Sequence, residues 1–293
     1  ARIRKKEIDM SQWNLIIDVA RCENCNNCVL ANKDEFVGNS FPGYSASQQL
    51  HGESTIKIHR TVRGEGHMVD AAYLPTMCNH CDDAPCMKNA NGCITKRGDG
   101  IVIIDPEKSR GRKDLVAACP YGSIVWNEEL EIPQNWIFDA HLLDKGWKEP
   151  RCSQSCPTGS IKAIKASKAE MANKAKQESL QVLKPELNTQ PRVYYKNLHR
   201  VTHSFIGGSV VANVAGQLEC IEGAKVELVK DGSTQHQMYT DAFGDFKFDA
   251  LKHDSGKYKV LVHHKSGFAQ RDVTLGISQF LGDVELSNTN VAL

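Results

Sequence analysis

The stretch Cys22-Glu-Asn-Cys25-Asn-Asn-Cys28 contains three cysteines at intervals of three residues. A second stretch, Cys78-Asn-His-Cys81-Asp-Asp-Ala-Pro-Cys86, repeats the arrangement with a longer second gap. Two more cysteines, Cys119 and Cys156, each precede a proline. Two triplets and two Cys-Pro singlets make eight thiolates, enough for two [4Fe–4S] clusters with four cysteines each. The sequence therefore predicts an iron–sulfur protein with two clusters.

The spacing also separates this pattern from other uses of cysteine. Zinc ribbons combine pairs of cysteines, not triplets with a distant Cys-Pro, so zinc or unligated structural cysteine is the weaker alternative. Disulfide scaffolds are typical of small secreted domains, whereas this chain has 293 residues and an odd number of cysteines, 11. In the ferredoxin run C-x2-C-x2-C-x3-C-P the fourth cysteine serves the other cluster, so we expect triplets and singlets to cross-pair. Spacing alone leaves open which singlet completes which triplet.

The ferredoxin spacing also indicates a cluster site that has lost its cysteines. Counting forward from Cys86 and back from Cys119 gives four ligand positions, and none holds a normal cluster ligand. We call these positions the Leu115 site; they are Ala90, Ser109, Arg112 and Leu115. Four coherent replacements favour one lost cluster over unrelated substitutions.

A second site is emptied in the same way. Its ligand positions hold one cysteine only, and we call it the Cys152 site; its members are Asn32, Trp136, Asp139 and Cys152. One thiolate does not hold a cubane. Because a carboxylate can ligate iron, an aberrant centre at Asp139 is the alternative. His141 is close to Asp139 in sequence, and we expect both to fill the emptied pocket or a partner interface and not to act as acid and base.

The rest of the chain indicates two domains. Residues 167–180 are expected to form a helix with a Ser167/Glu170 capping box, and residues 184–191 an extended linker. After about residue 200, alternating segments at 224–229, 245–249, 257–262 and 283–286 predict short strands. We expect an α+β fold with domains at 1–198 and 199–293.

Composition excludes several classes of protein. The chain carries 41% hydrophobic and 24% charged residues with a net charge of +1, so it can form real cores and has no global charge that would steer it to nucleic acid. No apolar run approaches the roughly 18 residues of a membrane span. Clustered free thiols predict a reducing compartment, for which we take the cytoplasm. Cys93 and Cys220 are expected to be buried small hydrophobes.

Beyond these patterns, the sequence resembles the iron–sulfur (beta or small) subunits of the dimethyl sulfoxide reductase family of molybdenum enzymes, particularly the pyrogallol–phloroglucinol transhydroxylase branch. The stretches that carry the resemblance include Ile17–Cys28, Gly100–Lys108, Cys119–Gly122, Ala140–Asp144 and Pro191–Leu198. The resemblance implies a nested double ferredoxin-like domain followed by a small all-β sandwich of the transthyretin or carboxypeptidase-regulatory type.

The resemblance also implies the ligand sets and the partner. Nested pairing would give one cluster to Cys22, Cys25, Cys28 and Cys156, and the other to Cys78, Cys81, Cys86 and Cys119. A large catalytic subunit would hold bis-molybdopterin guanine dinucleotide with molybdenum, or less readily tungsten, in a heterodimer or a multiple of it. The resemblance implies that the complex would act on hydroxylated aromatics in anaerobic metabolism. The chain itself would transfer electrons and would contain no catalytic residue.

Two other functions stay open at this stage. The Cys152 site lies between the two retained clusters in the family, and its loss lengthens the tunnelling distance. The chain could therefore be a structural or assembly subunit whose clusters staple the fold. It could also be the small subunit of a respiratory reductase, although those subunits normally keep more clusters.

Overall fold

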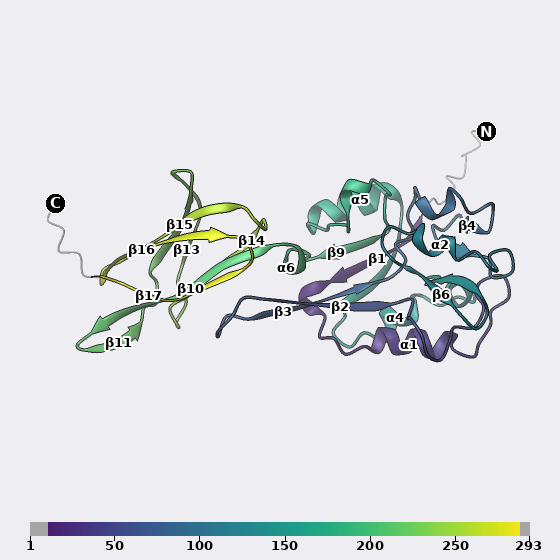
Figure 1. Cartoon of the computed structure of the whole chain (residues 1–293), viewed down its shortest axis with the longest axis horizontal. Helices are drawn as coiled ribbons and strands as arrows, with labels where there is room; N and C mark the ends of the chain where they lie inside the picture. Colours follow the sequence, from purple (N-terminus) through teal and green to yellow (C-terminus); the bar gives the residue numbers. More distant parts are fainter. Residues whose placement is uncertain (1–10, 288–293) are drawn as a thin grey trace, which may run out of the picture. The chain divides into compact units, whose positions relative to one another are not determined.

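The computed structural model describes residues 11–287, and the chain divides into two compact units (Figure 1). One unit includes the chain up to Arg60 together with Tyr73–Leu198. The other includes Thr61–Ala72 together with the chain from His199 onward. The sequence analysis left segment 61–72 in the first domain, but its contacts belong to the second unit.

The first unit consists of short elements joined by the cysteine loops. Its sheets are a three-stranded sheet of order β8-β1-β9 and the two-stranded pairs β4–β5 and β6–β7. Its strands are β1 (Gln12–Asp18), β4 (Ile94–Lys96), β5 (Val102–Ile104), β6 (Ile124–Asn127), β7 (Ile132–Asn135), β8 (Ile161–Ala166) and β9 (Val193–Lys196). Its α-helices are α1 (Asn27–Phe36), α2 (Asp114–Ala117), α3 (Ala140–Leu143), α4 (Arg151–Gln154) and α5 (Lys168–Gln177). Its 3₁₀ turns are η1 (Val19–Arg21), η2 (Pro85–Met87) and η3 (Pro185–Leu187).

One local prediction for this unit is confirmed. Helix α5 begins after Ser167, whose side chain accepts from the backbone N–H of Glu170 while the Glu170 carboxylate accepts from the backbone N–H of Ser167. This capping box satisfies two of the backbone N–H groups that a helix start leaves unpaired. Strand β5 lies within the apolar run 100–105, and all three of its residues are buried.

The predicted linker at 184–191 is part of the first unit instead. The carbonyls of Gln190 and Thr189 accept from the backbone N–H groups of Asp82 and Asp83, at 2.9 and 3.1 Å. Thr189 is buried. The segment therefore packs against the second cysteine loop, a long-range pairing that the local Pro and Asn content did not reveal.

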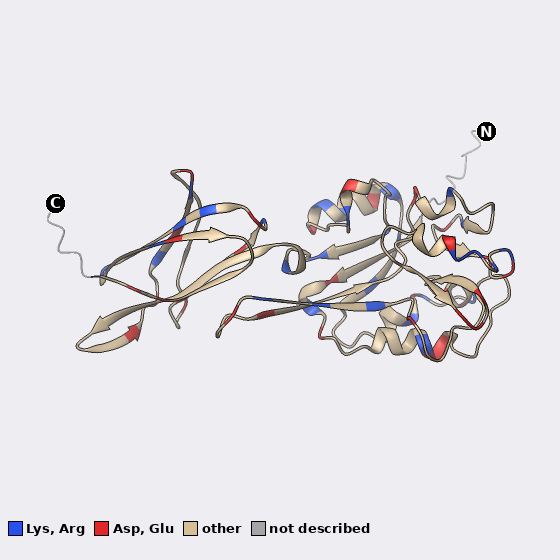
Figure 2. Ribbon diagram, viewed as in Figure 1, with Lys and Arg blue, Asp and Glu red and all other residues tan. Residues whose placement is uncertain are grey.

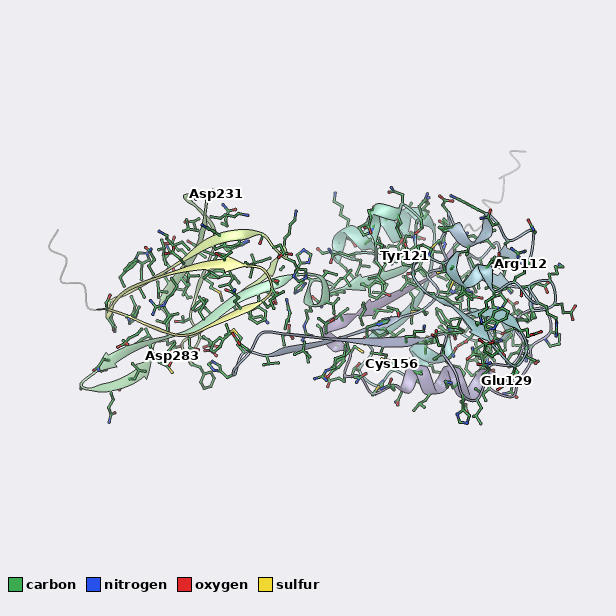
Figure 3. The ribbon with its side chains drawn as sticks, in the orientation of Figure 1. Arg112, Tyr121, Glu129, Cys156, Asp231 and Asp283 are labelled. Carbon is green, nitrogen blue, oxygen red and sulfur yellow. The ribbon has the colours of Figure 1, made fainter. Side chains whose placement is uncertain are left out.

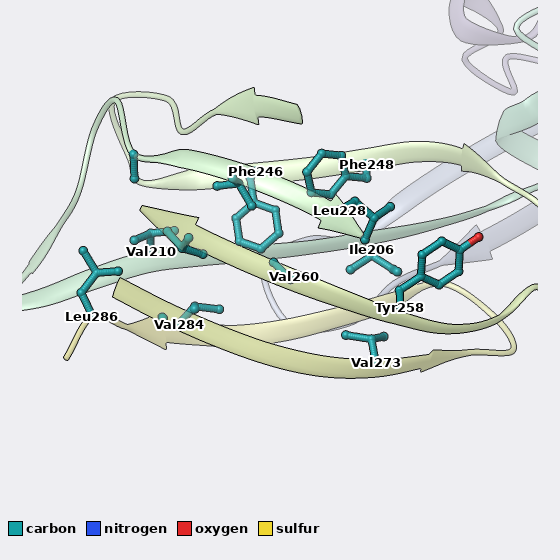
Figure 4. Close-up of a cluster of buried hydrophobic side chains, with 14 of the residues drawn as sticks. Ile206, Val210, Leu228, Phe246, Phe248, Tyr258, Val260, Val273, Val284 and Leu286 are labelled. Carbon is teal, nitrogen blue, oxygen red and sulfur yellow. The ribbon is translucent and has the colours of Figure 1, made fainter. Parts of the chain in front are cut away.

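The second unit contains two four-stranded sheets around one core (Figure 4). One sheet has the order β11-β10-β14 with β17 also paired to β10, and the other has the order β13-β12-β15-β16. The elements are α6 (His199–Thr202), β10 (Ser204–Val214), β11 (Gln217–Cys220), β12 (Lys225–Lys230), β13 (Ser233–Tyr239), β14 (Asp245–Leu251), β15 (Gly256–His264), β16 (Gly267–Leu275) and β17 (Gln279–Glu285). The four strand segments predicted after residue 200 therefore lie in strands.

The core of this unit follows from alternation along the strands. Val226 and Leu228 of β12 are fully buried, as are Val260 and Val262 of β15, whereas their neighbours in sequence are more exposed. Side chains of a strand point alternately to its two faces, so one face of each sheet is apolar and meets the other. Asp231 and Gly232 have φ values of 49° and 77°, which suit the tight turn between β12 and β13.

The hairpin of β2 (Lys57–Arg63) and β3 (Asp70–Thr76) contributes residues to both units. Its tip belongs to the second unit, where Arg63 is nearly buried and forms ion pairs with Asp70 at 2.6 Å and Asp249 at 2.7 Å. Gly64 is required here because a Cβ at that position would lie 2.2 Å from the backbone carbonyl oxygen of Met68. These contacts explain why segment 61–72 clusters with the sandwich.

Charges are mixed along both units (Figure 2), in keeping with the net charge of +1. Among the helices within residues 11–287, none is long and apolar enough to cross a membrane.

Candidate metal centre

The structure brings Cys22, Cys25, Cys28 and Cys156 together around one hollow of about 290 Å³, and we call them cysteine set 1. Three of the four lie on the loop between η1 and the first turn of α1. Asn24 and Asn26 in this loop adopt the left-handed conformation, with φ of 55° and 61°. Asparagine tolerates this conformation well, and the two turns wrap the loop around the hollow. Ile58 and Pro75 complete part of its wall.

Cys78, Cys81, Cys86 and Cys119 line a second hollow of about 400 Å³, and we call them cysteine set 2. His80 is left-handed with φ of 46°, which turns the loop between Cys78 and Cys81, and Cys86 lies on η2. Within residues 11–287, no group of three or more His, Cys, Asp or Glu side chains is spaced to hold a single metal ion.

The two Cys-Pro turns fold alike. Gly122 and Gly159 donate their backbone N–H groups to the carbonyls of Cys119 and Cys156, at 3.0 and 3.1 Å, and a strand follows each turn. The serine after each glycine then anchors the turn: Ser123 Oγ donates to Met77 O at 2.9 Å and Ser160 Oγ to Asp18 O at 2.8 Å. The repeated Cys-Pro-x-Gly-Ser-Ile sequence is thus one structural unit used twice (Cys156 is labelled in Figure 3).

The thiols of cysteine set 1 lie in contrasting surroundings. Burial raises the pKa of Cys28 to about 12 and also raises the pKa of Cys22. At Cys156 burial acts in the same direction, but hydrogen bonds from the backbone of Ile161 and the Thr158 hydroxyl outweigh it and lower the pKa. Cys25 is exposed. Neighbouring thiolates would repel one another, so a cationic metal core is needed to keep all four ionised.

Cysteine set 2 has no exposed member, because Cys81 is buried and the other three are partly buried. Burial raises the pKa of Cys86 to about 12 and also raises the pKa of Cys78 and of Cys81. The backbone N–H of Ser123 donates to Cys119 Sγ at 3.4 Å. Four thiols around a hollow, with backbone N–H groups directed at sulfur, form a donor set that suits a [4Fe–4S] cluster.

Several residues around cysteine set 2 were not found from the sequence. Lys96 donates three hydrogen bonds, to the carbonyls of His80, Cys81 and Gly100 at 2.8 to 2.9 Å, and so fixes the cysteine loop to β4 and β5. Thr189 lies beside Cys81 and bonds to the Tyr121 hydroxyl at 2.6 Å. Neither residue belongs to a cysteine motif, and only their position in the fold reveals them.

His80 supports the loop by hydrogen bonding. Its Nδ1 accepts from the backbone N–H of Val102 at 3.0 Å, and burial lowers its pKa to about 3. The ring packs against Trp136, with centroids 5.5 Å apart. The residue is therefore a neutral structural group beside Cys78.

The Leu115 site is filled mainly by an apolar cluster. Ala90 and Leu115 are buried in it together with Cys93, whose Sγ donates to Ala90 O at 2.8 Å. Ser109 is also buried. Arg112 turns toward Asp114 and the Asn89 carbonyl, at 2.7 and 2.8 Å.

The Cys152 site is filled by buried side chains of mixed polarity. Trp136, Asp139 and Cys152 are each no more than 2% exposed. Asn32 donates to Gln48 and Thr55 at 3.2 and 3.1 Å. The site is thus closed by side chains that belong to α1, α4 and the segment before α3.

The two cysteines outside the motifs differ from each other. Cys93 is buried, as expected from the sequence. Cys220 is exposed, and the expectation that it is buried was wrong. It lies on β11, an edge strand whose four residues are all exposed, so the alternation of a two-sided strand does not apply.

Comparison with known proteins gives a consistent set of relatives. The 4Fe-4S dicluster domain family matches residues 69–165. The chain is 45% identical over 254 residues to the pyrogallol hydroxytransferase small subunit of Pelobacter acidigallici, covering 86% of this chain and 90% of that protein. It is 32% identical over 192 residues to a subunit of the tetrathionate reductase of Salmonella typhimurium, covering 64% and 73%. It is 27% identical over 232 residues to the arsenate respiratory reductase iron-sulfur subunit of a Shewanella species, covering 62% and 94%.

These matches extend along most of the chain. The matched proteins contain the ferredoxin-type domain and are subunits of one group of enzymes. The matched domain also establishes [4Fe–4S] clusters as the class of cofactor. The chain therefore belongs to the iron–sulfur subunits of the dimethyl sulfoxide reductase family of molybdenum enzymes, as the sequence predicted.

Proposed function

We propose that this chain transfers electrons through two [4Fe–4S] clusters, one held by cysteine set 1 and one by cysteine set 2. The observation that supports this proposal most directly is the pair of hollows, each lined by one cysteine triplet and one Cys-Pro cysteine. Bound clusters would supply reversible one-electron transfer. The chain's own residues would set the potentials through burial, charge and N–H donors to sulfur.

The two sets offer different environments for such clusters. Cys25 is exposed and Cys28 lies in the first turn of the ten-residue helix α1. The partial positive charge of a helix start favours the more negative state of a nearby cluster. Cysteine set 2 has no exposed member, and burial disfavours added charge. We infer that the cluster at set 1 takes up an electron more readily.

We further propose that the chain acts beside a large catalytic subunit, in a heterodimer or a multiple of it. That partner would hold bis-molybdopterin guanine dinucleotide with molybdenum. The identity to a pyrogallol hydroxytransferase small subunit supports hydroxylated aromatics as the substrates of the complex. The cytoplasm is the compartment we propose, because all 11 cysteines are free. We propose domains at 1–198 and 199–293, with segment 61–72 grouped by its contacts with the second, which is a transthyretin-like sandwich that supports the assembly.

The decisive experiment uses the complex purified without oxygen. Iron and acid-labile sulfide per copy of this chain should each be about eight for two cubanes. Rapid-freeze paramagnetic resonance during turnover should then show the clusters changing oxidation state with substrate. Clusters that stay in one state throughout turnover would refute electron transfer and favour a structural role. Zinc in place of iron would refute the cluster assignment itself.

A further inference from the structure

Asp139 of the Cys152 site is a carboxyl group in the protein interior. It is 2% exposed. Its Oδ2 accepts from the backbone N–H of Arg151 at 2.7 Å, whereas its Oδ1 has no hydrogen-bond partner among residues 11–287. A buried carboxylate with half of its acceptor capacity unused is costly, and such groups tend to take up a proton.

Across the part of the chain that the structure describes, no side-chain cation forms an ion pair with this carboxylate. The guanidinium of Arg151 in α4 attracts the Asp139 carboxylate only from a distance. That guanidinium forms ion pairs with Glu35 and Asp34 of α1, at 2.5 and 2.6 Å. His141 of α3 bonds to Glu35 at 2.8 Å, and burial lowers the pKa of its ring.

The remaining groups that face Asp139 do not stabilise its negative charge strongly. Glu35 itself is negative, and Cys152 of α4 is a buried thiol. Among the groups that favour the ionised form of Asp139, the indole of Trp136 has the smallest effect. Its Nε1 has no hydrogen-bond partner among residues 11–287. Burial, assisted by Glu35 and opposed by the Arg151 N–H, raises the pKa of Asp139 to about 6.

Asp139 also lies electrostatically close to cysteine set 1. Its charge acts on the Cys152 thiol, and the charge of Cys28 acts on the same thiol. Hydrogen bonds at the two ends of α4 give the geometric link: Asp139 Oδ2 accepts from the N–H of Arg151, the first residue of α4, and Ser155, just after α4, donates from Oγ to Asn27 O beside Cys28 at 3.4 Å. Negative charge added at that set would be felt by Asp139 through a dry, low-dielectric interior.

We propose that Asp139 is a redox-linked proton-binding site that serves the cluster at cysteine set 1. This inference rests on the proposed function of that set. When the oxidised cluster accepts one electron from its redox partner, Asp139 accepts one proton from water and becomes a neutral carboxylic acid. When the cluster gives up the electron, the O–H bond breaks and the proton returns to water. The added electron and the added proton cancel, so the net charge of the protein does not change on reduction.

The test is a potentiometric titration of the anaerobic holoprotein, followed by paramagnetic resonance, at several pH values. Uptake of one proton per electron makes the midpoint potential fall with rising pH, because each pH unit is a tenfold change in proton concentration, worth about 59 mV for one electron. We expect a slope approaching this value from about pH 6 upward and a flat response in Asp139→Asn. The matched control is Asp144→Asn, which changes a more exposed carboxylate just beyond α3 and should keep the wild-type slope.

A second readout is independent of potential. Difference infrared spectra on reduction should show a protonated carboxyl band that is missing in Asp139→Asn. A flat wild-type response, or an equal slope in wild type and Asp139→Asn, would overturn the inference. If the holoprotein contains two clusters and either result is found, the redox proposal stands and only the proton site fails. If it contains no iron–sulfur cluster, the proposed function fails first.

Discussion

The Leu115 site offers a direct test of the idea that a cluster was lost there. The perturbation is a fourfold variant, Ala90→Cys, Ser109→Cys, Arg112→Cys and Leu115→Cys, which restores the ferredoxin ligand spacing. The four positions already lie near one another: Ala90 and Leu115 share one buried cluster, and the Arg112 side chain reaches the carbonyl of Asn89. We expect the variant to bind a further [4Fe–4S] cluster.

The structure sets the size of the effect on the unloaded protein. Leu115 is completely buried, and replacing it by the smaller cysteine removes apolar contacts and leaves space. Leu→Ala changes in cores cost about 3–5 kcal/mol, and we expect about 2 kcal/mol for this smaller truncation. The exposed Arg112–Asp114 ion pair adds little. The unloaded variant should therefore unfold at lower denaturant, and iron should reverse the loss, because the cluster binds only the folded form.

The assay is iron and acid-labile sulfide per chain after anaerobic reconstitution, with thermal unfolding measured in parallel. Iron should rise from about eight to about twelve atoms per chain as four more irons bind. The control is Leu115→Cys alone, which should show the stability loss without added iron. A folded fourfold variant that binds no more iron than the wild type would refute the argument that these positions once formed one ligand set.

Four further predictions concern single residues. Cys28→Ser should abolish the cluster at set 1 and halve the iron content, whereas Cys220→Ser, an exposed cysteine on an edge strand, should leave iron unchanged. Cys152→Ala should leave the iron content at the wild-type value; a drop would show that this thiol holds a metal. Asp139→Asn should stabilise the unloaded chain at neutral pH by up to about 3 kcal/mol, because the folded-state pKa of Asp139 is raised from 3.8 to about 6 and stability is lost as pH rises between these values. Unfolding at pH 4 and pH 7.5 measures this, and a gain that is no larger at pH 7.5 would contradict it. Arg63→Met removes the nearly buried partner of Asp70 and Asp249, but Lys247 still pairs with both and Arg200 with Asp70, so we expect a loss of about 1–3 kcal/mol in chemical unfolding, with no change in iron per chain.

Local features of the sequence predicted local features of the fold. The capping box of α5 and the alternation in β12 each depend on residues within a few positions of one another. The partner of each Cys-Pro turn depends on contacts far apart in sequence, such as Ser160 with Asp18, and spacing alone could not identify it. The resemblance to a family supplied that information.

The features missed by the sequence analysis are long-range as well. Segment 61–72 joins the second unit through Arg63 and Asp249, which are 186 positions apart. Segment 184–191 looks like a linker by composition but covers the loop of cysteine set 2. Neither assignment can be made from the local sequence. An ion pair or a backbone hydrogen bond between distant segments does not produce a periodic pattern of residue types.

The two emptied sites are closed in different ways, and the difference bears on function. The Leu115 site is filled mainly by apolar groups, and its one buried polar atom without a partner among residues 11–287 is the neutral hydroxyl of Ser109. The Cys152 site retains buried polar atoms that lack partners among residues 11–287, Asp139 Oδ1 and Trp136 Nε1. Each such atom costs about 1–3 kcal/mol, and an apolar replacement would remove that cost. If the Cys152 site served packing alone, we would expect apolar side chains there, because they avoid the free-energy cost of buried polar atoms without partners. The polar filling beside cysteine set 1 is therefore what we expect if Asp139 exchanges a proton as the neighbouring cluster exchanges an electron.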